Sequence, residues 1–309
     1  MVVADPIDPE ALRRLALGPC EVIDASAGAA ALAEHLSQAW GLIVRSRTKV
    51  TADLIGKAPL LSVVARAGVG VDNVDLPAAT ARGIRVVNAP TAATESVAEI
   101  TVAFMLMLVR DLFSQIQTTK AGRWERGGNR QELAGKEVGF LGYGRIAREV
   151  ARKLTAFSVR SRAFDPFVKN TDDGTEMLDL ETVLSGSDIV SVHAALTPEN
   201  HHLLNAERIQ GMRRGAYVVN VARGPLIDEA ALLAALDSGQ LGGAALDVFE
   251  TEPPRDPRLL AHPKVLATPH IGAATHEAQA RAGSQIVDEV LRALNSQPLQ
   301  AWVNPPARS

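Results

Sequence analysis

The stretch Glu137-Val138-Gly139-Phe140-Leu141-Gly142-Tyr143-Gly144-Arg145-Ile146-Ala147 decides the fold of this chain. A hydrophobic run ends at Leu141, and a helical pattern starts near Arg145. The sharp turn between them needs glycine at Gly142 and Gly144, where Cβ atoms would keep a ligand away from the backbone. The helix N-terminus then offers unpaired N–H groups to a phosphate. The stretch predicts the pyrophosphate-binding turn of a βαβ unit; the alternative is an ordinary tight βα turn.

An acidic residue at the end of the next strand-like run favours the nucleotide interpretation. Asp165 directly follows Val159–Phe164. A carboxylate at this place accepts hydrogen bonds from ribose hydroxyls and repels a 2′-phosphate. We therefore expect NAD rather than NADP as the cofactor, with Arg145 and Ile146 at the start of the helix as further contacts.

Short β-branched runs alternate with Ala- and Leu-rich helical stretches along almost the whole chain, which is typical of βαβ units and parallel sheets. Two such series predict an α/β protein with two doubly wound parallel-sheet domains. The expected strands are Glu21–Asp24, Leu42–Arg45, Leu61–Arg66 and Ile84–Asn88 in the first series, and Glu137–Leu141, Val159–Phe164, Asp188–Val192, Ala216–Val221, Gly243–Val248 and Val265–Ala267 in the second.

Two long helical stretches, Glu95–Ala121 and Ala274–Leu294, are expected to cross between the domains, so that the C-terminus returns to the first one. The alternative is two domains strung in sequence, with the last helix covering the second sheet.

Length and composition agree with two globular domains. The chain has 309 residues, 47% of them hydrophobic and 22% charged, with a net charge of −3. At this size a single core stops growing, and the charge balance offers no basic field for nucleic acid or an anionic membrane. The first residues reach Asp5 and Asp8 without a long apolar run, and Cys20 is the one cysteine. We expect a cytoplasmic protein without disulfides or membrane attachment.

Three residues in the second half carry the chemistry of a 2-hydroxy acid. Arg223, at a strand end, has the planar charged fork that grips a carboxylate. His270 can remove the proton of an alcohol as hydride leaves the same carbon, and Glu252 can orient that imidazole. The alternatives are a surface arginine and a solvated loop glutamate. Adjacent histidines at His201–His202 point apart on a regular element, so we expect no metal site.

Several further stretches of the sequence together resemble one protein family. They are Val44–Thr51, Arg66–Asp75, Asn88–Thr91, Gly122–Arg126, Val219–Gly224, Ala245–Pro253 and Thr268–Gly272. In this order they resemble the D-isomer-specific 2-hydroxyacid dehydrogenase family from Arg45 to about Ser284. The resemblance implies a Rossmann-type NAD-binding domain, residues 96–283, inserted in a flavodoxin-like substrate domain formed by residues 1–95 and 284–309. Substrate would bind in the cleft between them. The family comparison also implies that residues beyond the glycine turn contact the cofactor; these are Thr197, Val221, Ala222, Asp247, Gly272 and Ala273. For Asp247 the alternative is a cap of the following turn.

On the substrate side, Gly68-Val69-Gly70 can present backbone N–H groups to a carboxylate, although any βα turn would look similar. Arg45, with Arg47 and Lys49, is the candidate for binding a substrate phosphate; a solvated rim of charge is the alternative. Trp124 and Arg126 are expected to contribute across a homodimer interface, as the matching segment does in some relatives.

Together with these expectations, the family resemblance implies one hypothesis: oxidation of 3-phospho-D-glycerate to 3-phosphohydroxypyruvate, the first step of serine biosynthesis. The rivals are a reductase for glyoxylate, hydroxypyruvate or another 2-keto acid, and an NAD-sensing binding protein of corepressor type. Because the sequence ends at Ser309, we expect no C-terminal regulatory domain and no serine feedback through one.

Overall fold

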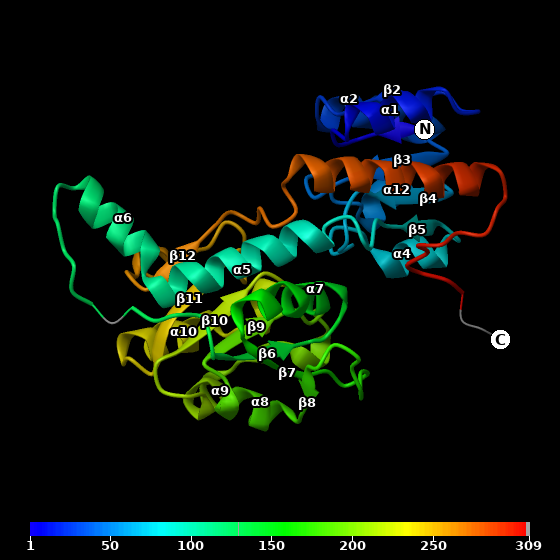
Figure 1. Cartoon of the computed structure of the whole chain (residues 1–309). Helices are drawn as coiled ribbons and strands as arrows, with labels where there is room; N and C mark the ends of the chain where they lie inside the picture. The colour runs from blue at the N-terminus through cyan, green and yellow to red at the C-terminus, as the bar shows by residue number, and fades with distance from the viewer. Residues whose placement is uncertain (129, 307–309) are drawn as a thin grey trace. The chain divides into compact units, whose positions relative to one another are not determined.

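The computed structural model describes residues 1–128 and 130–306. The chain divides into two compact units, one formed by Met1–Ala93 with Ala273–Ser309 and the other by Thr94–Gly272. Each unit contains one parallel sheet with helices on its faces (Figure 1). The predicted fold class, two doubly wound parallel-sheet domains, is confirmed.

The first unit has five parallel strands in the order β2-β1-β3-β4-β5. Its strands are β1 (Val2–Val3), β2 (Ile23–Asp24), β3 (Gly41–Val44), β4 (Val63–Arg66) and β5 (Arg85–Val87). Its helices are α1 (Pro9–Ala16), α2 (Ala29–His35), the short 3-10 helix Leu36–Gln38, α3 (Ala52–Gly56), α4 (Leu76–Ala81) and α12 (His276–Leu294).

The central strand β3 is buried on both faces, which explains why it is continuously apolar rather than alternating. Along β3, Leu42 and Val44 belong to one hydrophobic core and Ile43 to the other. Helices α2, α3 and α4 contribute Leu32, Ile55 and Ala79 to the first core. Helices α1 and α12 contribute to the second, with α12 packed against α1 and β4. This is the pattern expected of parallel strands that helices cover on both sides.

The end of the chain also belongs to the first unit. Trp302 forms an isolated antiparallel bridge with Val87 of β5, and the Asn304 Oδ1 accepts the N–H of Val86 at 2.8 Å. The sequence placed the second domain boundary at 283/284, inside α12, whereas the structural unit begins at Ala273. The boundaries differ because α12 is one continuous helix that packs on the sheet of the first unit, so all of its residues belong to that unit.

The second unit has seven parallel strands in the order β12-β11-β10-β9-β6-β7-β8. They are β6 (Glu137–Leu141), β7 (Arg160–Phe164), β8 (Glu176–Met177), β9 (Ile189–Val192), β10 (Ala216–Asn220), β11 (Leu241–Leu246) and β12 (Val265–Ala267). The helices are α5 (Thr94–Arg110), α6 (Leu112–Lys120), α7 (Arg145–Leu154), α8 (Leu180–Gly186), α9 (Ala206–Gly211), α10 (Glu229–Asp237) and α11 (Pro257–Ala261), with 3-10 turns at Thr155–Phe157, Pro198–Asn200 and Gly224–Leu226.

The strand order of the second unit reverses beside β6. The chain runs from β6 outward to β7 and β8, then returns to β9 on the other side of β6. In doubly wound sheets, ligands bind outside the carboxyl ends of the strands at such a reversal. Gly142 follows β6 directly, so the predicted cofactor turn lies at this point.

One predicted helix was wrong, and two strands were missed. The stretch Glu95–Ala121 is not one helix, because Asp111 adopts the left-handed conformation with φ 49° and separates α5 from α6. Aspartate tolerates that conformation better than most residues. The two-residue strands β1 and β8 were not predicted, whereas β2, of the same length, lies within the expected strand Glu21–Asp24. Among the described residues, no helix is long and apolar enough to cross a membrane.

Candidate active site

The glycine turn has the geometry that a close ligand requires. Gly142 has φ 86°, and a Cβ atom there would lie 2.6 Å from the backbone nitrogen of Ala194. Gly144 is the N-cap of α7 and makes no side-chain cap, and a Cβ built on it would meet nothing within 4 Å. The first glycine is therefore required by the protein itself. The second leaves open space in front of uncapped helix N–H groups, where a phosphate fits.

The carboxylate of Asp165 supports the same turn. Its Oδ2 accepts the N–H of Tyr143 at 2.8 Å. Its Oδ1 accepts the N–H groups of Phe167 at 2.8 Å and Val168 at 3.2 Å. A carboxylate has about four acceptor positions, so one position on Oδ2 remains open to a further donor. The structure thus places Asp165 beside the glycine turn, as the sequence predicted, and also gives it a main-chain partner.

Tyr143, between the two glycines, is a part of the turn whose contacts the sequence analysis missed. Its side chain is fully buried, and its hydroxyl lies 2.7 Å from Oδ2 of Asp173 and 2.6 Å from Oγ1 of Thr175. The guanidinium of Arg148 lies 4.9 Å from the ring centroid. Burial raises the pKa of the Tyr143 phenol, so it stays a neutral donor. Tyr143 thereby connects the cofactor turn to the loop before β8.

The structure brings His270 and Glu252 together. Nδ1 of His270 lies 2.9 Å from Oε2 of Glu252. Oε1 of Glu252 accepts the N–H of Phe249 at 3.3 Å, which fixes the carboxylate against its own loop. The side chains of His270 and Glu252 are 48% and 41% exposed. The imidazole therefore contacts Glu252 on one side and is open to solvent on the other.

Arg223 lies on a loop that contacts the loop of Glu252. The next residue, Gly224, approaches the Phe249 backbone so closely that a Cβ would fall 1.8 Å from that carbonyl carbon. The buried side chain of Asn220 shapes the turn before it, accepting the N–H of Ala222 and donating to the carbonyl of Arg223. Arg223, Glu252 and His270 thus follow β10, β11 and β12, three neighbouring strands, at their carboxyl ends.

Asp247 organises the loop that carries His270. The Asp247 side chain is almost fully buried and accepts three hydrogen bonds: from the Thr268 hydroxyl at 2.6 Å, the Ile271 N–H at 2.8 Å and the Gly272 N–H at 2.7 Å. These contacts flank His270, whose backbone has φ 54°. A left-handed non-glycine residue costs about 1 kcal/mol or more and persists where its surroundings hold it. Asp247 provides that hold.

The other predicted cofactor residues lie at the same edge of the second unit or next to it along the chain. Thr197 is the N-cap of the 3-10 turn after β9, where its N–H donates to Asn200 Oδ1 at 2.7 Å. Val221 and Ala222 follow β10, and Gly272 and Ala273 follow the His270 loop.

Apart from Arg223 and His270, the predicted substrate residues lie at the carboxyl ends of strands in the first unit. Arg45 follows β3 and Gly68-Val69-Gly70 follow β4. The carbonyl of Val69 accepts from the Asn88 side chain at 2.6 Å, and the carbonyl of Gly68 accepts from the Ala89 N–H. Arg47, part of the predicted phosphate cluster, directs its guanidinium instead to Asp5 and to the carbonyls of Ala4 and Ser26.

Among residues 1–128 and 130–306, no group of three or more His, Cys, Asp or Glu side chains is placed to hold a metal ion.

A cavity of about 720 Å³ lies apart from the candidate site, at the amino ends of β9 to β12. This is the edge of the sheet opposite the catalytic candidates, and the cavity wall includes Phe113, Arg213 and Tyr217. It contains none of the predicted site residues.

Residues 102–272 match the NAD-binding domain of the D-isomer specific 2-hydroxyacid dehydrogenases. The chain belongs to this family. The match spans more than half of the chain and includes the glycine turn, Asp165 and all three catalytic candidates, so the family and the type of cofactor domain that the sequence predicted are confirmed.

Curated relatives within the family carry two different names. The chain is 42% identical to human D-3-phosphoglycerate dehydrogenase over 309 residues, covering 98% of this chain and 58% of that protein. It is 41% identical to hydroxypyruvate reductase from Thermotoga maritima, covering 94% of this chain and 97% of that protein. A solved protein from Thermus thermophilus has 36% identity and a TM-score of 0.89, covering 98% and 99% of the two chains. The chain thus spans little more than half the length of the D-3-phosphoglycerate dehydrogenases that it matches.

Proposed function

We propose that the protein is an NAD-dependent dehydrogenase of a D-2-hydroxy acid, and that its preferred substrate is 3-phospho-D-glycerate. The observation that carries the proposal is the contact between His270 and Glu252, 2.9 Å long and partly open to solvent. A pure binding protein of corepressor type has no use for an oriented proton acceptor, so this pair favours an enzyme.

In this proposal His270 accepts the proton of the substrate hydroxyl. An ionised carboxylate can only accept hydrogen bonds, so Glu252 keeps the hydrogen on Nδ1 and leaves the lone pair on Nε2. The same carboxylate stabilises the positive charge that the ring gains. Arg223 holds the substrate carboxylate through its fork of donors. Bound NAD would supply the acceptor for the hydride that leaves C2, and the product would be the 2-keto acid.

The residues around the glycine turn fit a bound dinucleotide. Gly144 leaves open space before the uncapped N-terminus of α7, and Asp165 keeps an acceptor position beside the turn. A 2′-phosphate would meet the negative charge of Asp165, which supports NAD over NADP.

The proposed substrate follows from the anionic groups that the cationic side chains of this protein can bind. A phosphorylated hydroxy acid has a second anionic group, and Arg45 supplies a further cation for it in the first unit. The rival substrate class, hydroxypyruvate or glyoxylate, gains support from the full-length similarity to the Thermotoga maritima hydroxypyruvate reductase.

Initial rates with matched acids separate the two. With NAD, we expect kcat/KM for 3-phospho-D-glycerate to exceed that for D-glycerate and D-lactate by at least about tenfold. A factor of this size is what one additional charge-assisted contact contributes. Equal values would reject the phosphorylated substrate and favour the reductase. No absorbance change with any acid, despite NADH binding, would favour the binding protein.

We also propose that the protein is a homodimer, with α6 in the interface. Helix α6 has no buried residue, yet Phe113 and Ile116 on it are apolar and 45% and 48% exposed. Trp124, on the segment that follows, is 76% exposed, and both parts project from the second unit in Figure 1. Exposed apolar patches of this kind usually mark an interface. Sedimentation analysis of wild type and Phe113→Ser/Ile116→Ser tests this; a monomeric wild type would reject it.

A cytoplasmic location is proposed as well. The single cysteine, Cys20, is a free thiol, which fits a reducing compartment.

A further inference from the structure

In the first unit, Asp5 and Arg45 meet where the strand order reverses. Strand β1 lies between β2 and β3. From β1 the chain first moves to β2 on one side and then crosses to β3 on the other side, so the strand order reverses at β1. Asp5 lies just beyond the carboxyl end of β1, and Arg45 directly follows β3. The carboxyl ends of strands at such a reversal are where doubly wound sheets bind ligands.

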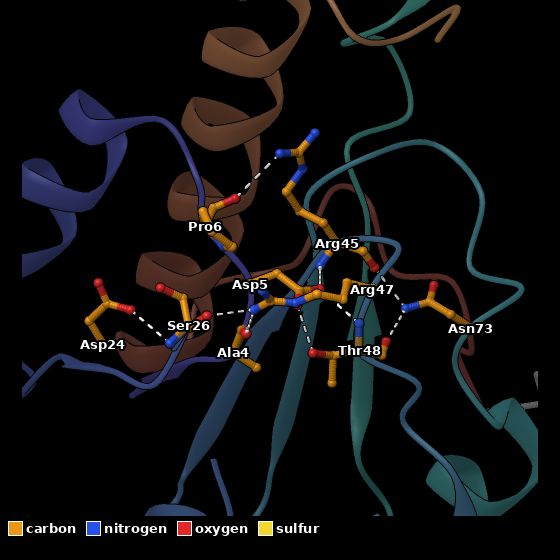
Figure 2. A network of polar contacts seen from close by, with 9 residues as sticks. All are labelled: Ala4, Asp5, Pro6, Asp24, Ser26, Arg45, Arg47, Thr48 and Asn73. Atoms are coloured by element: carbon orange, nitrogen blue, oxygen red, sulfur yellow. Dashed lines mark hydrogen bonds and ion pairs between the residues drawn. The ribbon is translucent and has the colours of Figure 1, made fainter. Parts of the chain in front are cut away.

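The side chain of Asp5 is only 2% exposed and is surrounded by donors from one loop (Figure 2). Oδ2 accepts the N–H of Arg45 at 2.6 Å and the N–H of Thr48 at 3.1 Å. Oδ1 accepts the Thr48 hydroxyl at 2.7 Å and Nε of Arg47 at 3.0 Å. All four acceptor positions of the carboxylate are thus used by the segment 45–48.

Asn73 holds the same segment from the other side. Its Nδ2 donates to the carbonyl of Arg45 at 2.7 Å and to the carbonyl of Thr48 at 2.6 Å (Figure 2). Asp5 therefore takes the N–H groups of Arg45 and Thr48, and Asn73 takes their C=O groups. Two side chains from distant parts of the sequence fix both ends of a four-residue loop.

The two arginines of this loop have different surroundings. Arg47 is engaged by the Asp5 carboxylate and by the carbonyls of Ala4 and Ser26, both at 2.8 Å. Among the residues that the structure describes, the Arg45 guanidinium makes one long contact, from Nη1 to the carbonyl of Pro6 at 3.5 Å, and it points away from the network in Figure 2. The charge of Asp5 is balanced by Arg47, so the charge of Arg45 remains available for an anion.

We propose that Asp5 and Asn73 are positioning residues that clamp the loop 45–48, so that Arg45 presents its guanidinium to the anionic end of the substrate. This inference rests on the proposed function and adds the device that orients one of its substrate contacts. A preorganised loop binds an anion more tightly because less conformational entropy is lost on binding.

The charge state of Asp5 agrees with this role. Burial alone would raise the pKa of Asp5, but the hydrogen bonds from Thr48, Arg45 and Arg47 outweigh burial and lower it. The carboxylate is therefore ionised at neutral pH and can accept from every donor around it.

The test compares Asp5→Asn with Asp24→Asn as a matched control. The amide keeps the size of Asp5 but loses the charge and part of the acceptor capacity. Asp24 lies nearby at the end of β2, where it accepts the N–H of Ser26 at 2.9 Å and makes no hydrogen bond to the loop 45–48 (Figure 2). We expect Asp5→Asn to raise KM for the hydroxy acid about tenfold or more, since small misplacements of binding groups have effects of this size. The values of kcat and of KM for NAD should change little, and Asp24→Asn should resemble wild type.

A double-mutant cycle with Arg45→Ala shows whether the clamp acts through Arg45. In that background Asp5→Asn should have little further effect on KM, because the group that it positions is already absent. An equally large effect with and without Arg45 would overturn the proposal. Asn73→Ala attacks the other half of the clamp and should reproduce the KM change if Asp5→Asn fails to fold.

Calorimetry with 3-phospho-D-glycerate and NADH-loaded protein gives a readout that does not need turnover. The clamp variants should bind this anion more weakly than wild type and Asp24→Asn. Equal affinities of wild type and the clamp variants would reject the clamp. If another acid is turned over best, the same ratios measured with that acid test the clamp, while the choice of 3-phospho-D-glycerate as substrate fails separately.

Discussion

Oε2 of Glu252 lies 2.9 Å from Nδ1 of His270, and Oε1 of the same carboxylate is held by the N–H of Phe249. The acid thus connects the imidazole to the loop after β11. His270 receives its orientation from the protein rather than from the substrate.

Replacing Glu252 with Gln should lower kcat by at least about tenfold while leaving the affinity for NAD unchanged. The amide no longer stabilises the charged ring, and its NH₂ group can face Nδ1 and favour the wrong tautomer. Glu250→Gln is the control, because Glu250 lies in the same loop but accepts the N–H of Glu229. Equal kcat losses in both variants would show a general disturbance of the loop.

The two glycines of the cofactor turn should respond differently to alanine. Gly142→Ala places a Cβ 2.6 Å from the Ala194 backbone at φ 86°, so the thermal midpoint should fall clearly. Gly144→Ala meets only open space, so the midpoint should change little while NAD binding weakens. Thermal unfolding and NADH fluorescence titration measure the two effects. Unimpaired NADH binding by Gly144→Ala would show that no pyrophosphate lies there.

The choice between NAD and NADP should depend on the charge of Asp165. Asp165→Asn keeps one oxygen to accept from the main chain but no longer repels a 2′-phosphate. We expect the ratio of kcat/KM for NAD over NADP to fall about tenfold or more, as the loss of one charge-assisted contact implies. An unchanged ratio, measured with the same hydroxy acid, would assign discrimination to another residue.

Stability should decrease in mild acid because of His193. Burial lowers the pKa of His193 to about 3, and its Nε2 lies 2.8 Å from the Ser191 hydroxyl. The unfolded chain binds the proton near pH 6.5, so the folded state loses up to about 1.4 kcal/mol per pH unit between about pH 6.5 and 3. His193→Gln should lose less stability than wild type between about pH 7 and 5. His276→Gln, at the exposed start of α12, should follow wild type.

The sequence predicted what local patterns encode. Strand β6 and the glycines after it follow from one hydrophobic run and one turn, and β12 was predicted with its observed bounds. Strand β1, which has only two residues, was missed. The break at Asp111 was missed because one left-handed residue does not interrupt an apolar pattern.

The contacts that shape the candidate site were less predictable. Asp5 and Arg45 are far apart in the sequence, and nothing local indicates that a carboxylate after Val2–Val3 accepts the N–H groups of a later loop. Asp247 and Tyr143 also act through distant partners, Thr268 and Thr175. Sequence motifs thus indicated which residues gather at the strand ends, while the hydrogen bonds that hold them required the fold.

The most direct test of the catalytic proposal is the turnover of His270→Ala, with NAD binding measured on the same sample. We expect kcat to fall by at least about a hundredfold, as for loss of a general base, while NADH titrates with wild-type affinity. Turnover close to wild type, or parallel losses of kcat and NADH affinity, would contradict the proposal that His270 accepts the substrate proton.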